Sequence, residues 1–281
     1  MNDAAPPRRI WLCADDYGLS PGVNRAIRDL IGRGRLNATS AMVVGAAIGR
    51  DEVGALQAVA ARSPRCAIGL HATLTAPFRP LTMHFQPIDG GLFLGFAKLL
   101  RMGLLRRLDP EIIHAELMVQ IATFNEMFGR GPDFVDGHQH VQLFPQVRDA
   151  FLTAVKQAAP NAWVRQGGRR QPLARRLGTP KALLLDLLSA QFRKRAAHAD
   201  IAFNPGFDGA YDFSRSPGFG VQMRQFLDRL PEGGVIMCHP GFVDDVLVSL
   251  DPLTAQREHE HAFLGGEDFP RLLAANNVTL G

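Results

Sequence analysis

The sequence is poor in cysteine and in long hydrophobic runs, and each shortage excludes a class of protein. Only three of 281 residues are cysteines, and Cys13, Cys66 and Cys238 each lie in an apolar run. An odd, widely spaced set predicts buried thiols in a reducing compartment and not a disulfide framework. The most apolar stretches, near 92–105 and 182–188, are too short or are interrupted by charge, so we expect no membrane-spanning helix.

Targeting segments and the common nucleotide-binding motifs are also absent. Residues 1–9 are polar and contain proline, without the apolar core of a secretory signal. The sequence has no Walker A loop, no GxGxxG at a strand–helix junction and no zinc-finger spacing. We therefore expect a cytoplasmic protein, for which peripheral contact with the inner face of the membrane stays open.

Positive charge is modest in total but concentrated in one segment. Thirty-one Lys and Arg against 27 Asp and Glu give +4. Nine basic residues and one acid, Asp186, fall within 165–195, so this basic segment carries +8 and the rest of the chain −4. Because interleaved aromatic residues are missing there, we expect no nucleic acid partner. A solvated face, a homodimer contact and an anionic lipid surface remain as alternatives.

Short apolar runs alternate with amphipathic segments, which predicts β/α units around a mainly parallel sheet. The expected strands are 10–14, 37–44, 67–70, 134–136, 162–164, 201–203, 235–238 and 278–280. The expected helices are 21–34, 51–62, 110–128, 145–158, 181–195, 217–230 and 268–276. About seven units without an internal repeat predict a single-domain (β/α) barrel-like fold over 1–281, distorted or incomplete. Residues 75–108 break the rhythm, and we expect an inserted segment or lid there.

Polar clusters follow four of the predicted strands. They are Asp15-Asp16, His71, the run 136–140 and His239. Each cluster alone is compatible with a turn residue, a cap or a structural histidine. Since the carboxyl ends of barrel strands meet at one rim, their coincidence predicts a mononuclear site of one carboxylate and two imidazoles. A period of two would place His138 and His140 on one face of an extended segment.

These motifs resemble, in order, those of the YdjC-like carbohydrate deacetylases. The matching segments are ADDYGLSPGVN at 14–24, NATS at 37–40, GLH at 69–71, DGHQHV at 136–141 and CHPGF at 238–242. The resemblance extends from the first strand to about Leu264. It is greatest to the hopanoid-biosynthesis-associated branch, which acts on an N-acetylglucosaminyl group carried by a bacterial hopanoid lipid.

The resemblance implies a barrel-like fold and a metal-dependent hydrolase that removes an N-acetyl group from an amino sugar. The ligands of one divalent ion, zinc or magnesium, would be Asp16, His71 and His138. Asp15 would be the catalytic base, His239 the general acid, and Arg257 an arginine near the base. One departure is visible, because Gln142 stands where many relatives have the last histidine of a His-x-His-Val-His run.

Two other functions share the same ligand set. Two histidines and one carboxylate also form the facial triad of non-haem iron oxygenases, in which Asp15 would have no obvious role. A glycan-binding module without turnover is the third possibility, although base, ligands and acid are all present. Acetate release without oxygen would separate the three.

The inserted segment has an unusual composition. Leu92–Arg107 combines eight Leu and Phe residues with four basic residues and contains no acid. This composition is typical of a helix that lies on an anionic membrane surface. A lid helix that packs on the barrel and leaves a solvated basic edge explains it equally well.

Overall fold

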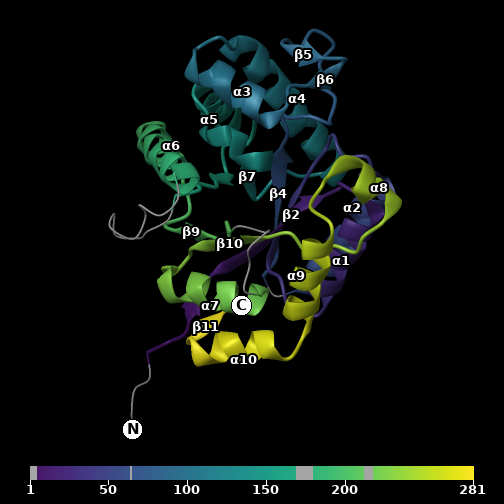
Figure 1. Ribbon diagram of the computed structural model, residues 1–281, viewed down its shortest axis with the longest axis vertical. Coiled ribbons are helices and arrows are strands. Elements are labelled where there is room, and N and C mark those ends of the chain that lie inside the picture. The colour runs from purple at the N-terminus through teal and green to yellow at the C-terminus, as the bar shows by residue number, and fades with distance from the viewer. Residues whose placement is uncertain (1–4, 64, 169–179, 212–217) are drawn as a thin grey trace.

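Seven parallel strands form the centre of the fold in the order β8-β7-β4-β3-β2-β10-β9 (Figure 1). The computed structural model describes residues 5–63, 65–168, 180–211 and 218–281. The strands are β2 Trp11–Tyr17, β3 Ala38–Ala41, β4 Ala67–Ala72, β7 Phe134–Gly137, β8 Trp163–Val164, β9 Phe207–Asp208 and β10 Val235–Cys238. The sheet is curled into a half barrel, which confirms the predicted incomplete (β/α) barrel-like fold.

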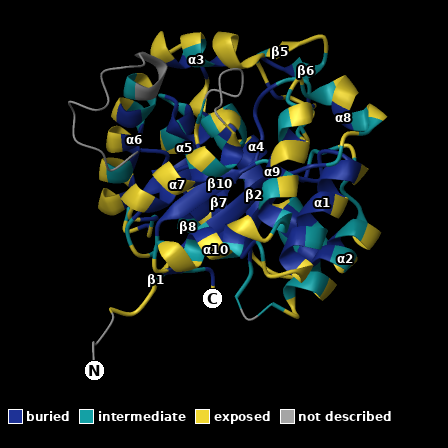
Figure 2. Ribbon diagram, turned by 60° about the horizontal axis from the view of Figure 1, so that its bottom comes forward, coloured by how far each residue is buried: buried dark blue, intermediate teal, exposed yellow. Residues whose placement is uncertain are grey.

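Helices cover the outer side of this sheet, and their exposed positions point away from it (Figure 2). They are α1 Pro21–Gly32, α2 Arg50–Ala60, α4 Pro110–Phe128, α5 Val147–Ala158, α6 Pro180–His198, α7 Phe219–Arg229, α8 Asp245–Leu250, α9 Ala255–Gly265 and α10 Asp268–Ala275. A 3-10 helix, η1 (His138–Leu143), follows β7 directly. None of the helices in the described part of the chain is long and apolar enough to cross a bilayer.

Capping residues fix where the best-predicted helices begin. Ser20 accepts a hydrogen bond from the Val23 backbone N at 3.2 Å, which satisfies one donor of the first turn of α1. Asp109 does the same for α4, at 2.9 Å from the Glu111 N. Both helices continue with proline, which has no backbone N–H to satisfy. These local signals explain why both starts could be read from the sequence.

The inside of the half barrel is filled by a small apolar cluster of its own. Its buried members are Cys13, Ala38, Ala67, Phe134, Phe207, Val235 and Met237. The Phe134 ring occupies the space beside Gly69, where a Cβ atom would lie 2.5 Å from the ring. Because the interior is packed with side chains, polar chemistry is confined to the rim at the carboxyl ends of the strands.

The inserted segment lies over this rim and is tied to the barrel by polar contacts. It contains a hairpin of β5 (Ile88–Asp89) and β6 (Leu92–Phe93), followed by α3 (Phe96–Leu104). The carboxylate of Glu116 on α4 is buried and accepts hydrogen bonds from Leu81 N at 3.1 Å and from Thr82 N at 2.9 Å. The insertion is therefore an ordered part of the fold.

Several predicted elements differ from those observed. β2 runs on through both aspartates, whereas 201–203 makes only a bridge between Phe203 and Val164. β9, α8 and α9 were not predicted, since each is short or lacks a clear apolar period. The last strand, β11 (Val278–Thr279), pairs with β1 (Arg8–Arg9) outside the main sheet. Its apolar pattern predicted a strand but carried no information on its partner.

The cysteines and part of the basic segment can also be placed. Cys13 and Cys238 are buried, Cys66 is half-buried, and all three are free thiols, as predicted. The basic segment is not one surface: Arg165 is buried, and Arg193 donates inward to the Gln166 Oε1 at 2.9 Å. Residues 169–179, with four of its arginines, lie outside the described residues.

Candidate active site

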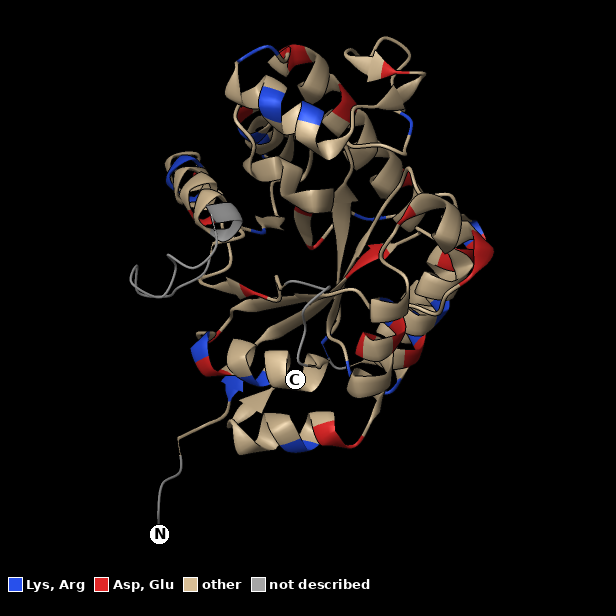
Figure 3. Cartoon of the chain, in the orientation of Figure 1, with Lys and Arg blue, Asp and Glu red and all other residues tan. Residues whose placement is uncertain are grey.

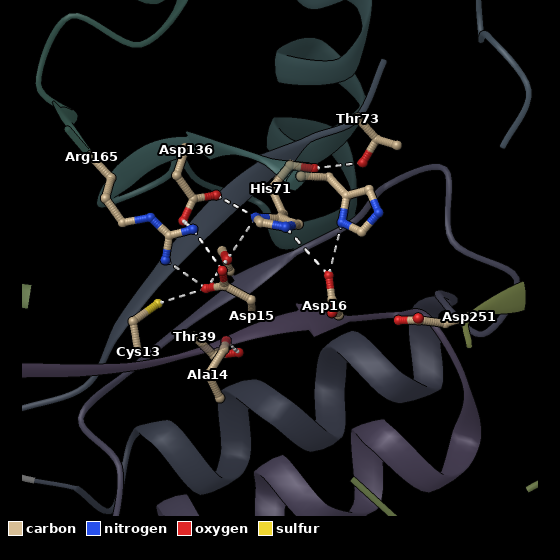
Figure 4. A network of polar contacts seen from close by, with 12 residues as sticks. Cys13, Ala14, Asp15, Asp16, Thr39, His71, Thr73, Asp136, Arg165 and Asp251 are labelled. Carbon is tan, nitrogen blue, oxygen red and sulfur yellow. Dashed lines mark hydrogen bonds and ion pairs between the residues drawn. The ribbon is translucent and has the colours of Figure 1, made fainter. Parts of the chain in front are cut away.

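The rim of the half barrel gathers the polar clusters predicted from the sequence. Asp15 and Asp16 lie near the end of β2 and His71 near the end of β4 (Figure 4). His138 directly follows β7. A register shift between β2 and β3 falls at this point, between Ala14 and Tyr17. Asp16 itself has a left-handed φ of 71°. In a regular strand two consecutive side chains point to opposite faces of the sheet, whereas this irregularity lets both carboxylates lie at the same rim.

Asp16, His71 and His138 offer three donor atoms within 4.8 Å of one another, a set that could hold a metal ion. Asp16 Oδ1 lies 3.3 Å from His71 Nε2 and 3.1 Å from His138 Nδ1. The other ring nitrogen of His71 lies 2.5 Å from Asp136 Oδ1. A hydrogen bond from Nδ1 to a carboxylate leaves the lone pair on Nε2, the tautomer that a metal ion requires.

Asp15 is held separately by an arginine that sequence reasoning did not assign to the site. Arg165 follows β8 and donates two hydrogen bonds of 2.6 Å, one to each oxygen of Asp15. The same guanidinium lies 3.0 Å from Asp136 Oδ2. Burial alone would raise the pKa of Asp15, but Arg165, with His71, holds that pKa well below its usual range. Asp15 is therefore ionised at any pH near neutrality.

The second buried arginine, Arg257 of α9, pairs with Asp16 and Asp251. The resemblance placed Arg257 near the base, and its Nη2 lies 2.7 Å from Oδ2 of the adjacent Asp16 and 2.6 Å from Asp251 Oδ2. Arg257 therefore engages the proposed ligand and not Asp15. Because it occupies Oδ2, only Oδ1 of Asp16 faces the two histidines. Burial opposes ionisation of Asp16, but Arg257 and the two imidazoles keep its pKa well below its usual range.

The net charge of this network is one that a divalent ion could neutralise. Two guanidinium groups, Arg165 and Arg257, neutralise only part of four carboxylates, Asp15, Asp16, Asp136 and Asp251. A net charge of −2 remains when the histidines are neutral. Burial lowers the pKa of His71, but Asp136 outweighs it and raises that pKa to about 10. Without a cation the ring is thus protonated, and a cation bound to Nε2 would displace that proton.

His239 comes from the other side of the site. It follows β10, is half-buried, and its backbone N donates to Glu260 Oε2 at 2.5 Å. The other oxygen of Glu260 accepts a 2.6 Å hydrogen bond from the Tyr211 hydroxyl. Burial raises the pKa of Glu260. Glu260, on α9, thereby fixes the backbone that carries the proposed acid, a contact that the sequence motifs do not reveal.

The segment after β7 corrects the expected relation between His138 and His140. Gln139 and His140 have left-handed φ values of 54° and 59° inside η1, so the segment is not extended and the period-two prediction is wrong. His138 faces Asp16, whereas the His140 ring packs edge-on against Phe207 at 5.5 Å. Burial and the charge of Arg165 lower the pKa of His140 to about 3, so this ring is neutral.

Two further sequence features acquire structural roles. Gln142, the departure from the family pattern, is buried and donates to the Arg165 carbonyl at 3.1 Å, so it supports the arginine that holds Asp15. Residues 18–22 read GLSPG, which fits the GxSxG pattern of serine hydrolases. Ser20 is buried and its hydroxyl caps α1, a role in helix stability that leaves the pattern without catalytic meaning.

The buried pair of Arg165 and Asp15 predicts a large effect on stability. We expect Arg165→Met to lower the free energy of unfolding by about 3–5 kcal/mol, because two buried carboxylates lose their counter-ion. Arg130→Met is the matched control. Arg130 also makes two hydrogen bonds to one carboxylate, Asp133, but both side chains are exposed, so we expect a loss below about 1 kcal/mol.

Urea unfolding measures both variants, and pH gives an independent readout. The pKa of Asp15 is lower in the folded than in the unfolded chain, so its stabilisation is present above the ordinary aspartate range and is lost as the pH falls. The difference between wild type and Arg165→Met should therefore narrow in acid. Equal losses for both arginine variants would contradict a special role for the buried pair.

Solved structures show the same fold in other proteins. A proposed cellobiose-phosphate cleavage protein from Enterococcus faecalis V583 superposes with a TM-score of 0.74 at 21% identity, over 98% of this chain and 97% of the other. The lactam utilization protein from Thermus thermophilus gives a TM-score of 0.53 at 15% identity, over 97% and 98%. At these identities the similarity establishes the fold alone.

Sequence comparison identifies the family. A chitooligosaccharide deacetylase of Yersinia pestis (strain Pestoides F) is 29% identical over 245 residues, which cover 84% of this chain and 83% of that protein. A chitooligosaccharide deacetylase of Yersinia pseudotuberculosis serotype O:1b matches equally well. The family described as YdjC-like protein matches residues 9–275. The chain therefore belongs to the YdjC-like family.

Proposed function

We propose that this protein hydrolyses the N-acetyl group of an N-acetylglucosamine-type sugar carried by a hopanoid lipid. Its family and its chitooligosaccharide deacetylase relatives support a hydrolase that acts on N-acetyl groups of carbohydrates. The observation that carries the proposal is the division of labour between two adjacent aspartates. Asp16 joins two imidazoles, while Asp15 is held apart from them by Arg165.

The residues present fit one divalent ion. Asp16 Oδ1, His71 and His138 would hold it, and their buried network has the charge that such an ion neutralises. When bound, zinc or magnesium supplies Lewis acidity, which acidifies a water molecule and polarises the acetyl carbonyl. Arg257 is then a positioning residue, since it fixes the orientation of the Asp16 carboxylate.

Asp15 is the proposed base. Hydrolysis forms a bond from the water oxygen to the acetyl carbon and breaks the bond from that carbon to the sugar nitrogen, so the water must lose a proton. Asp15 is ionised and oriented by two hydrogen bonds from Arg165, and it accepts that proton. A carboxylate with so low a pKa is a weak base, so the proton transfer depends on a water that is already acidified.

His239 is the proposed acid. The sugar amine is a poor leaving group unless its nitrogen gains a proton as the C–N bond breaks. His239 comes from β10, on the side of the rim opposite His71 and His138 in the strand order, and its half-buried ring can reach substrate. Products are acetate and a free amino sugar.

The lipid-linked acceptor rests on the resemblance of the motifs to the hopanoid-associated branch. Peripheral contact at the cytoplasmic face of a membrane, and a homodimer, belong to the same proposal. The oxygenase alternative leaves Asp15, Arg165 and His239 without a task, and a binding module has no need of a held base. Hydrolysis uses each of these residues.

Substitutions of Asp15 and of the proposed ligand His138 test whether base and metal ligands have separate roles. We expect Asp15→Asn to keep bound metal and to lose acetate release by about 10²–10⁴-fold, the usual contribution of a general base. His138→Ala should lose both metal and activity. Metal content by mass spectrometry, measured beside acetate release on the same samples, separates the two effects. An Asp15→Asn enzyme that retains a near-normal rate would remove the base from the mechanism.

The proposed role of His239 as the acid predicts a change in the pH dependence of the rate. For His239→Ala we expect bound metal to stay, the rate to fall, and the alkaline limb of the pH–rate profile to flatten, because that limb reports deprotonation of the general acid. The profile of kcat/KM for wild type and variant gives the measurement. An unchanged alkaline limb would show that another group donates the proton.

A substrate panel tests the acceptor. Acetate release should be compared under anaerobic conditions for free N-acetylglucosamine, chitobiose and a hopanoid glycoside of N-acetylglucosamine. We expect the lipid glycoside to have the highest kcat/KM, since remote binding energy from the lipid can lower the barrier. Highest turnover of chitobiose would reject the hopanoid acceptor but keep the deacetylase. A requirement for oxygen would favour the oxygenase.

A further inference from the structure

Exposed apolar side chains are unevenly distributed over the molecule. The described residues contain twelve large hydrophobic side chains that are exposed, and six of them lie in the insertion between residues 81 and 105. These six are Leu81 (39% exposed), Met83 (94%), Ile88 (36%), Phe96 (36%), Leu104 (51%) and Leu105 (51%). The insertion thus contains half of the exposed large hydrophobic side chains of the described residues. Such concentrations mark interaction surfaces.

The same segment is basic on its exposed side. Its five cationic side chains are all exposed, and they are Arg79, Lys98, Arg101, Arg106 and Arg107. Its one acid, Asp89, lies 3.2 Å from Lys98 and is neutralised by it. Figure 3 shows basic positions along α3 and in the turn after it, at the end of the molecule away from the N-terminus. Apolar and cationic side chains are therefore exposed on the same segment.

One face of α3 packs on the body of the protein, and its opposite face is exposed. Leu99 and Gly103 face inward, and a Cβ atom on Gly103 would lie 2.8 Å from the Pro145 carbonyl oxygen, so this face is tightly packed. The Phe96 ring meets Phe144 at 5.4 Å. The outer face carries Arg101 and Leu104, three residues apart and both exposed. A helix that packs on the protein through one face exposes the opposite face along its whole length, as a helix that lies on a membrane surface does.

The insertion also borders the proposed active site. The Phe78 ring is buried and meets the His138 ring edge-on at 5.8 Å. The Phe78 carbonyl accepts a hydrogen bond of 2.9 Å from the backbone N of Phe93, a residue of the strand β6 that leads into α3. Whatever binds the outer face of the insertion is therefore brought close to the rim that holds His138.

We propose that the exposed side of the insertion docks onto an anionic lipid bilayer. This docking face consists of Leu81, Met83, Ile88, Phe96, Arg101, Leu104, Leu105, Arg106 and Arg107. It rests on the proposed function, because it would present the rim to a sugar whose lipid stays in the membrane. Charge complementarity selects the occupant, since cationic side chains attract the headgroups while leucines enter the boundary of the acyl chains.

Acidic neighbours set the strength of the attraction. Asp109 and Glu111 are exposed at the start of α4, directly after the docking face, and offset part of its charge. Electrostatic attraction alone is thus weak, and the apolar side chains must contribute. Binding should consequently need both an anionic headgroup and the leucines.

Vesicle co-sedimentation of the full chain tests this surface. We expect wild type to bind vesicles of phosphatidylcholine mixed with phosphatidylglycerol at low salt, and to bind pure phosphatidylcholine much less. The double variant Leu104→Glu/Leu105→Glu should weaken binding to the mixed vesicles by about tenfold or more, because it removes apolar area and adds negative charge. Thermal melting confirms that these exposed substitutions leave the fold intact.

A matched control uses exposed apolar residues elsewhere. Leu187 on α6 is 59% exposed and Val248 on α8 is 61% exposed, and neither belongs to the docking face. Leu187→Glu/Val248→Glu makes the same change in charge and should leave vesicle binding unchanged. Equal loss in both double variants, or no binding by wild type at low salt, would overturn the docking face.

Activity on a soluble substrate separates this proposal from the proposed function. Neither leucine lies in the catalytic network, so Leu104→Glu/Leu105→Glu should release acetate from chitobiose at the wild-type rate and lose activity only on vesicle-borne glycoside. Vesicle binding without acetate release from any substrate would reject the function and keep the docking face. Release from all substrates without vesicle binding would reject the docking face alone.

Discussion

The site depends on how buried charge is balanced at the rim of the half barrel. Arg165 serves Asp15 and Asp136, and Arg257 serves Asp16 and Asp251. Ion pairs as deeply buried as these stabilise little in net terms, since desolvation opposes them, but loss of either partner is costly. They therefore act as a constraint. Each guanidinium fixes which carboxylate is available for which task.

The two arginines act on the adjacent aspartates in different ways. Arg165 takes both oxygens of Asp15, so this carboxylate stays ionised and fixed in direction. Arg257 takes one oxygen of Asp16 and leaves the other to the histidines. His71 joins the two halves, because its ring nitrogens face Asp16 and Asp136. The pairing of arginines thus provides the separation between ligand and base that the proposed hydrolysis needs.

Sequence reasoning located the rim but not its electrostatics. Strand ends are local signals, so Asp15, Asp16, His71 and His239 could be placed from apolar runs that stop at polar residues. Arg165 follows a predicted strand in the same way, yet its many basic neighbours suggested a surface. Partners of buried charges are set by tertiary packing, and nothing in the spacing distinguishes a partner of Asp15 from one of Asp16. Strand partners are also set by tertiary packing, so the sequence did not reveal that β11 pairs with β1.

Backbone irregularity was the second feature that periodicity missed. A pattern of period two assumes an extended chain, but Gln139 and His140 adopt left-handed conformations directly after β7. Such conformations cost energy for residues with a Cβ atom and persist where the surroundings enforce them. Here they turn His138 toward Asp16 and send His140 to Phe207. Three of the seven left-handed non-glycine residues in the described part of the chain, Asp16, Gln139 and His140, thus lie at the carboxyl ends of β2 and β7, where the proposed chemistry lies.

The insertion connects this rim to the surface by covalent and packing links. Glu116 on α4 holds the loop at Thr82, and Phe78 reaches from the insertion to His138. A rigid attachment would matter for the proposed lipid-linked substrate, because the enzyme would have to approach a sugar that cannot diffuse into solution. If the docking face were carried on a loose loop, membrane binding would leave the rim free to point elsewhere. Since the insertion packs on the barrel, binding through its outer face also orients the site.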